Sequence, residues 1–210
     1  MRLVATGQSS PRSSEPIRLP TYEVVVREGP EPRVLDFDIE TIAAGFADPN
    51  WVPQKITCVA WSWVGNDGVE IRTRLEDGIK PMLEDFLAAY NEADVVTGHN
   101  ITRFDLPIVN SEMLRNGYPS LKTILAEDTM SLVKTKGFKK GQDVLATLLK
   151  LPVDKLPLNW QQWQDAYEED DWATIKQRCA GDVIQHKLLR VEMKKRGMLN
   201  PPRKWKPRAS

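Results

Sequence analysis

The stretch VLDFDIET, residues 34–41, decides the fold of this chain. Apolar and acidic side chains alternate along it, which is the pattern of a β-strand whose successive side chains face opposite sides of a sheet. Asp36, Asp38 and Glu40 therefore share one face, and the apolar residues between them share the other. Because apolar residues flank the acids, we expect a central strand. Three like charges on such a strand require partners elsewhere in the chain.

The sequence on either side of this strand predicts an α/β fold. A first strand is expected at 21–28, and strands at 33–40, 55–65 and 69–75 form an antiparallel meander. Beyond it the pattern alternates, with helices expected at 80–91, from Asp105, at 143–150 and at 172–196, and strands at 93–100 and 124–128. A meander followed by βαβ units predicts a mixed β-sheet flanked by helices.

Composition sets the outer limits. With 210 residues and 41% hydrophobic content, the chain can form one core of ordinary size. We expect a disordered tail at 1–20, a domain at 21–197 and a basic tail at 198–210. A formal net charge of zero gives no overall field that would attract a polyanion. Cys58 and Cys179 lie in apolar elements, which favours free thiols in a reducing compartment. No stretch approaches the roughly 18 apolar residues of a membrane span.

Four acids form the candidate site. Asp38 and Glu40 stand two residues apart on the strand, about 6 to 7 Å along it, so both can reach the same hard cation. Asp105 lies in GHNITRFDLP at a strand-to-helix junction, where helix capping is the alternative interpretation. Asp182 is expected to point inward, because it shares a helical face with mainly apolar residues: Ile175, Cys179, His186, Leu189 and Met193.

Three segments resemble the motifs of the DEDD, or DnaQ-like, 3′-to-5′ exonucleases, and most closely those of the phage and family B polymerase type. These segments are FDIET, NITRFD and RCAGDV, and the resemblance covers about residues 33–195. It implies an RNase H-like fold and phosphodiester hydrolysis with two Mg²⁺ or Mn²⁺ ions, which suit an all-oxygen ligand set. The implied metal ligands and catalytic residues are Asp38, Glu40, Asp105 and Asp182, and the implied substrate-binding residues are Thr41, Asn100 and Phe104.

The chain departs from the resemblance at the general base. The family places a Tyr four residues, or a His five residues, before the last Asp, where this chain has Arg178 and Gln177. Neither side chain can accept a proton near pH 7. Three alternatives stay open: Tyr167 in a shifted register, His186 one helical turn beyond Asp182, or a metal-bound water that needs no dedicated base.

Basic segments point to nucleic acid. Lys136, Lys139 and Lys140 belong to a lysine cluster without acids, and seven basic residues lie between Lys194 and Arg208. Such clusters can neutralise phosphates, and Trp205 could stack on a base. Solvated surface is the alternative for both segments.

The resemblance implies single-stranded DNA 3′ ends as the partner, with RNA or a replicative polymerase as further possibilities, no membrane, and a bacterial or phage-infected cytoplasm. The alternative functions are a structure-selective nuclease on forked, flap or branched DNA, an RNA-trimming exonuclease, and a catalytically weakened module that binds nucleic-acid ends or a polymerase.

Overall fold

The computed structural model describes residues 30–42, 55–133, 139–152 and 155–207. The chain divides into two compact units, Met1–Glu31 and Pro32–Ser210, and the second contains every helix and strand named below. The tail expected at 1–20 and the strand expected at 21–28 lie outside the described residues. The elements are, in chain order, β1 (Val34–Ile42), β2 (Lys55–Trp63), β3 (Glu70–Thr73), α1 (Ile79–Glu92), β4 (Val95–Gly98), α2 (Asp105–Arg115), β5 (Ile124–Asp128), α3 (Gln142–Leu148), α4 (Trp160–Glu168), α5 (Trp172–Lys195) and β6 (Arg203–Trp205).

The described strands form one mixed sheet in the order β3-β2-β1-β4-β5-β6. β1, β2 and β3 pair antiparallel, which confirms the meander. β4 pairs parallel with β1, and β5 pairs parallel with β4, as expected of strands joined by helical crossovers. The acidic strand is therefore central, as its apolar flanks predicted. The fold class is α/β, with a six-stranded mixed sheet flanked by helices.

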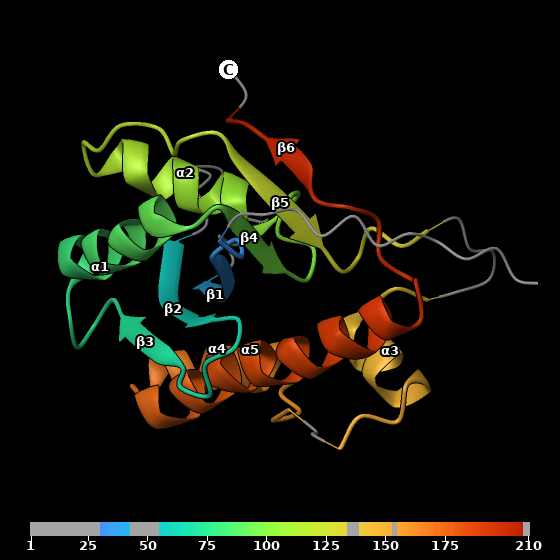
Figure 1. Ribbon diagram of the computed structural model, residues 1–210. Helices are drawn as coiled ribbons and strands as arrows, with labels where there is room; N and C mark the ends of the chain where they lie inside the picture. The colour runs from blue at the N-terminus through green and yellow to red at the C-terminus, as the bar shows by residue number, and fades with distance from the viewer. Residues whose placement is uncertain (1–29, 43–54, 134–138, 153–154, 208–210) are drawn as a thin grey trace, which may run out of the picture. The chain divides into compact units, whose positions relative to one another are not determined.

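Helices cover both faces of this sheet (Figure 1). Alternation along β2 separates the two layers: Val59 and Trp61 join the core under α1 and α2, whereas Cys58 and Ala60 join the core under α4 and α5. β1 divides in the same way, and its apolar side chains lie in the α1 and α2 layer. The acids of β1 therefore face α5, because strand side chains alternate.

α5 presents the inward face that the sequence predicted. Asp182 and His186 are 5% and 2% exposed, and the apolar members of the same stripe are fully buried: Ile175, Cys179, Leu189 and Met193. The stripe combines two neighbouring clusters, one against β2 and one against α3. No helix among the described residues is long and apolar enough to cross a membrane.

Two elements were absent from the sequence prediction. α4 replaces an expected loop, and it begins at a capping box in which Asn159 accepts a hydrogen bond from the Gln162 amide and Gln162 reaches back to Asn159. β6 lies within the segment expected to be a basic tail, and it pairs antiparallel with β5. Three residues rich in charge carry no alternation signal, so this strand exists only through its pairing partner.

Candidate metal centre

Three carboxylates converge where β1 meets α5. Asp38 and Glu40 lie on the α5 side of β1, and Asp182 extends from α5. One carboxylate oxygen from each lies within 4.8 Å of the others. The register between β1 and β2 shifts between Glu40 and Thr41, and such a bulge bends a strand and changes the direction of its side chains. The structure thus brings together three of the four acids that the resemblance implies.

Asp105 completes the group from the other side of β1. It is the first residue of α2 and is buried, and its Oδ1 accepts a hydrogen bond from the Ile39 backbone N–H at 3.1 Å. Ile39 lies between Asp38 and Glu40, so this bond holds the α2 carboxylate against the acidic strand. The helix N-cap is Phe104, without a side-chain capping bond. The capping interpretation of Asp105 is therefore wrong.

Two cations lie against the carboxylates. Arg178 Nε is 2.9 Å from Asp182 Oδ2 and 3.5 Å from Glu40 Oε1, and its guanidinium also donates to the Leu156 carbonyl. Lys155 Nζ is 2.8 Å from Asp182 Oδ1. Lys155 was not among the sequence candidates. Its signal in the sequence was a basic residue beside Asp154 in an otherwise apolar, Pro-containing loop.

The electrostatics of the group reflect burial first and crowding of like charge second. Loss of hydration raises the pKa of Asp38 well above its ordinary value, and the neighbouring Asp182, Asp105 and Glu40 raise it further. Burial, followed by Asp182, raises the pKa of Glu40 to about 7, against an opposing effect of Arg178. Burial raises the pKa of Asp105 to about 8. Without a bound cation, these acids hold protons at pH values where free carboxyl groups have lost them.

The residues present fit a hard divalent cation. The donors are carboxylate oxygens, which Mg²⁺ and Mn²⁺ prefer. Asp182 Oδ1 is buried and lies 2.8 Å from Lys155 Nζ. The three acids clustered within 4.8 Å still outnumber the two protein cations beside them, and a bound cation would compensate the remaining charge.

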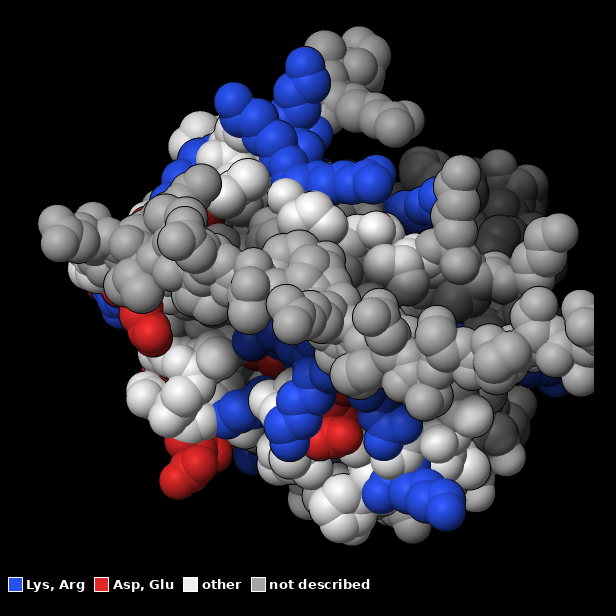
Figure 2. Space-filling model, turned by 45° about the vertical axis from the view of Figure 1, so that its right-hand side comes forward, with Lys and Arg blue, Asp and Glu red and all other residues white. Residues whose placement is uncertain are grey.

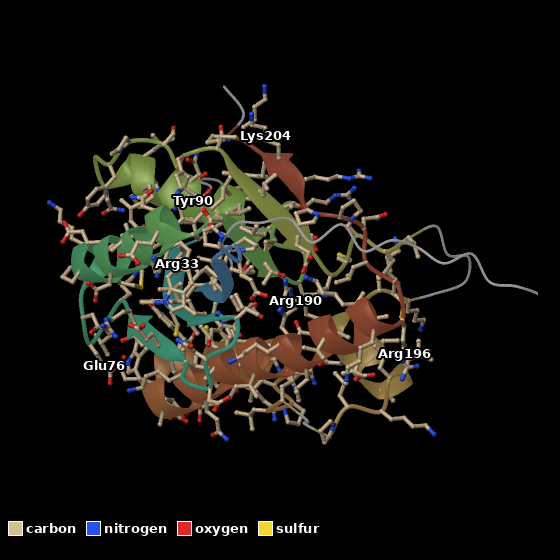
Figure 3. All side chains as sticks on the ribbon, in the orientation of Figure 1. Arg33, Glu76, Tyr90, Arg190, Arg196 and Lys204 are labelled. Carbon is tan, nitrogen blue, oxygen red and sulfur yellow. The ribbon has the colours of Figure 1, made fainter. Side chains whose placement is uncertain are left out.

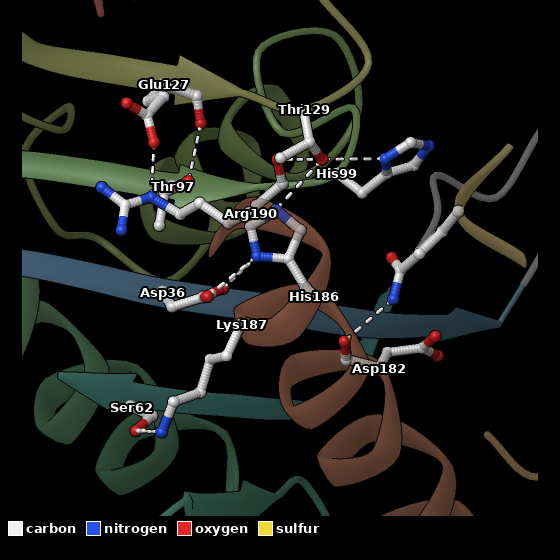
Figure 4. A network of polar contacts seen from close by, with 12 residues as sticks. Asp36, Ser62, Thr97, His99, Glu127, Thr129, Asp182, His186, Lys187 and Arg190 are labelled. Carbon is white, nitrogen blue, oxygen red and sulfur yellow. Dashed lines mark hydrogen bonds and ion pairs between the residues drawn. The ribbon is translucent and has the colours of Figure 1, made fainter. Parts of the chain in front are cut away.

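Asp36 and His186 form a separate polar network (Figure 4). His186 Nδ1 lies 2.8 Å from Asp36, and Nε2 lies 3.0 Å from Thr129 Oγ1, which also contacts His99 Nδ1 at 2.9 Å. Asp36 has no counterpart in the resemblance, and the sequence predicts a solvated or locally hydrogen-bonded role for it. This prediction is wrong, because Asp36 is 1% exposed and its partner lies 150 residues away. Both ring nitrogens of His186 are engaged in this network. These contacts give His186 a structural role and leave neither ring nitrogen free to act as a base.

The second alternative base is also engaged in packing. Tyr167 on α4 stacks edge-on against Trp172, with ring centroids 5.7 Å apart, and packs against the Cys58 and Ala60 cluster.

Thr41 lies at the end of β1, where its carbonyl accepts a hydrogen bond from Trp163 Nε1 at 3.1 Å. This hydrogen bond anchors α4 to the strand that carries Asp38 and Glu40.

Asp128 organises the loop before α2, and it was not among the candidate residues of the sequence. Its Oδ1 accepts from the Asn100 and Met130 amides at 2.8 and 2.9 Å, and its Oδ2 accepts from the Thr102 amide and hydroxyl. Asn100 has a φ of 66°, a conformation that Asn tolerates better than most residues. Phe104, at the end of this loop, packs partly against the main core. The available signal was the position of Asp128 at the carboxyl end of a parallel strand.

A groove of about 1070 Å³ adjoins this loop, between α2 and the strands β5 and β6. Asn100 and Asp128 line one part of it, and Trp205 lines another while packing partly against the core. Lys and Arg side chains gather over β6 at the top of Figure 2, and Lys204 extends from this strand in Figure 3. Five basic residues line the groove: Arg103, Lys140, Arg203, Lys204 and Lys206.

The lysine cluster of the sequence is described only in part. Lys140 lines the groove and Lys139 is exposed beside it. Lys136 lies outside the described residues. The basic lining of the groove is therefore assembled from β6 and the residue that follows it, from the loop before α2 and from Lys140.

Comparison with known proteins supports the fold. No family model and no curated protein matches the chain. Among solved structures, it is similar to the family B DNA polymerase from the hyperthermophilic archaeon Pyrobaculum calidifontis, with a TM-score of 0.57 and 19% sequence identity. The match covers 78% of this chain and 24% of the polymerase chain, so this chain spans about a quarter of that protein's length. The likeness and the six-stranded mixed sheet are consistent with an RNase H-like fold.

Proposed function

We propose that this protein is a metal-dependent 3′-to-5′ exonuclease that hydrolyses phosphodiester bonds of DNA. The observation that carries the proposal is the convergence of Asp38, Glu40 and Asp182 within 4.8 Å, with Asp105 held against the same strand through Ile39. Four carboxylates from three elements, whose burial and mutual repulsion raise the pKa of several of them, are unfavourable unless a cation compensates them.

The chemistry follows from the donor set. A bound Mg²⁺ or Mn²⁺ would supply Lewis-acid stabilisation of the phosphate and a more acidic water. The protein's own contribution is rigid placement, because the ligands come from a central strand and two packed helices. Neither side chain that the sequence offered as a general base is placed for that role, since His186 is engaged through both ring nitrogens and the ring of Tyr167 packs against Trp172. We therefore expect slow turnover, lower by on the order of 10² to 10⁴ than with a positioned base.

The groove supports a nucleic-acid substrate. It adjoins the loop from His99 to Phe104, which leads directly into Asp105, so a strand lying in the groove would run toward the carboxylates. Its basic residues can neutralise phosphates, and Trp205 offers a partly exposed ring beside them. The neighbouring solved structure is a DNA polymerase, which favours DNA over other polyanions. A single strand fits best, because its bases are free to stack.

One observation favours a second candidate. Arg178 and Lys155 already compensate part of the carboxylate charge, so a catalytically weakened module that binds nucleic-acid ends could tolerate the four acids without metal. Activity separates the two functions. The weakened module would retain DNA without shortening it.

The test uses 5′-labelled single-stranded, duplex and branched DNA, and RNA, each with Mg²⁺ or Mn²⁺. Stepwise shortening from the 3′ end by the wild type, abolished in Asp38→Ala and kept in Asp67→Ala, supports the proposal. Asp67 is an exposed acid in the turn between β2 and β3, so its substitution controls for loss of charge alone. Internal cuts at branch points would favour a structure-selective nuclease, and shortening of RNA alone an exoribonuclease. Binding without cleavage in either metal would exclude all three.

A further inference from the structure

The position where the resembling family has a tyrosine is occupied here by a charged group within the carboxylate cluster. Arg178 stands one helical turn before Asp182 on α5, and its Nε lies 2.9 Å from Asp182 Oδ2 and 3.5 Å from Glu40 Oε1. The Leu156 carbonyl accepts a further hydrogen bond from the same guanidinium. Arg178 is therefore held between two of the three clustered acids, with 18% of its side chain exposed.

The positive charge of Arg178 does not depend on pH. A guanidinium keeps its proton throughout the pH range of proteins, and its spacing of four residues from Asp182 is fixed by the helix. Lys155 adds a second positive group at 2.8 Å from Asp182 Oδ1, and it also contacts the exposed Asp143 at 3.1 Å. Both oxygens of Asp182 thus face protein cations.

Charge balance then limits how many metal ions the centre can take. Asp38, Glu40, Asp105 and Asp182 contribute four negative charges when ionised, and the Arg178 and Lys155 cations lie against them. Asp143, which Lys155 also contacts, is 64% exposed, so solvent screens its charge and it is left out of this sum. One divalent ion makes this group neutral. A second would leave two uncompensated positive charges in a partly buried site, which is unfavourable.

We propose that the Arg178 guanidinium takes the place of one of the two cations expected for such a centre, so that this protein binds a single divalent ion there. The inference rests on the proposed function, because it concerns the metal of the same site. Asp38 forms no ion pair with any residue that the structure describes, so it is the clustered acid most available to that ion.

The experiment is calorimetric titration of the full chain with Mn²⁺, after removal of metal with a chelator. We expect one ion per chain for the wild type and two for Arg178→Gln, which removes the charge and keeps a long helix-compatible side chain. Arg178→Lys should bind one. Arg196→Gln is the matched control, because the exposed Arg196 lies at the end of α5 and pairs with the partly buried Glu192, away from the carboxylate cluster.

Electron paramagnetic resonance of bound Mn²⁺ gives an independent readout. A coupled pair of ions should appear in Arg178→Gln and be absent from the wild type. Two ions in the wild type would overturn the inference while leaving the nuclease proposal intact, and this requires no variant to fold. A single ion in folded Arg178→Gln would also overturn it. Absence of any binding to the wild type would instead remove the metal-dependent function itself.

Discussion

Replacement of Asp105 by Asn should stabilise the metal-free protein at alkaline pH while removing its function. The Asp105 carboxyl is buried against β1, and burial raises its pKa from an ordinary value of 3.8 to about 8. Asn keeps the shape of the side chain, and its Oδ1 can still accept the hydrogen bond from the Ile39 N–H. The substitution thus removes a charge without removing the contact.

The sign follows from which state binds the proton. Between about pH 4 and pH 8 the unfolded chain carries an ionised Asp105, whereas the folded protein keeps it protonated, so stability falls as the pH rises through this window. Below the window both states are protonated, and above it both are ionised. Each pH unit inside it removes about 1.4 kcal/mol. From pH 5 to pH 8 the wild type should therefore lose about 4 kcal/mol through Asp105, and the Asn variant should not.

Urea denaturation in the presence of a chelator, at pH 5 and at pH 8, measures this difference. Asp67→Asn serves as the control, since that acid is exposed. Addition of Mn²⁺ should restore stability to the wild type at pH 8 and stabilise Asp105→Asn less, because that variant keeps the three clustered acids and loses the fourth. If the variant lost as much stability between the two pH values as the wild type does, the burial argument for this carboxylate would be refuted.

Three further outcomes are expected. Asp36→Ala should lower the free energy of unfolding by about 3 kcal/mol, because it removes the carboxylate that pairs with the buried His186 imidazole. Asp36→Asn should lower it less. Equal losses for the two variants in urea denaturation would contradict this. Asp128→Ala should lower the free energy of unfolding by about 3 kcal/mol, because the hydrogen bonds that hold the loop are lost, and it should raise the KM for DNA. An unchanged KM would show that the loop does not contribute to substrate binding. The double variant Lys204→Ala/Lys206→Ala should reduce the slope of log K against log salt by about 1.4 for single-stranded DNA in fluorescence anisotropy. Lys80→Ala, on exposed α1 surface, should leave that slope unchanged.

The antiparallel meander, the central place of the acidic strand and the mixed sheet flanked by helices could be predicted from local patterns. Alternation in residues 34–41 placed three acids on one face of a central strand, and α5 covers that face in the structure. The spacing along α5 placed Asp182 inward, and it lies beside Asp38 and Glu40. These predictions succeeded because a side chain's direction depends on helical or strand periodicity, which a few neighbouring residues fix.

Contacts between residues far apart in the sequence could not be predicted from periodicity. Lys155 reaches Asp182 from a loop, and Asp128 at the end of β5 holds the loop before α2. β6 forms only because it pairs with the edge of β5. His186 was a candidate base in the sequence, and a partner 150 residues away made it structural.

The same division runs through the acidic strand. The sequence by itself determined that its three acids share a face, because alternation is a property of the backbone. Only the tertiary structure separated Asp36, paired with His186, from Asp38 and Glu40, which meet Asp182. The physical reason is that a buried charge is compensated by whatever the fold brings within a few ångströms, and sequence distance does not encode that proximity.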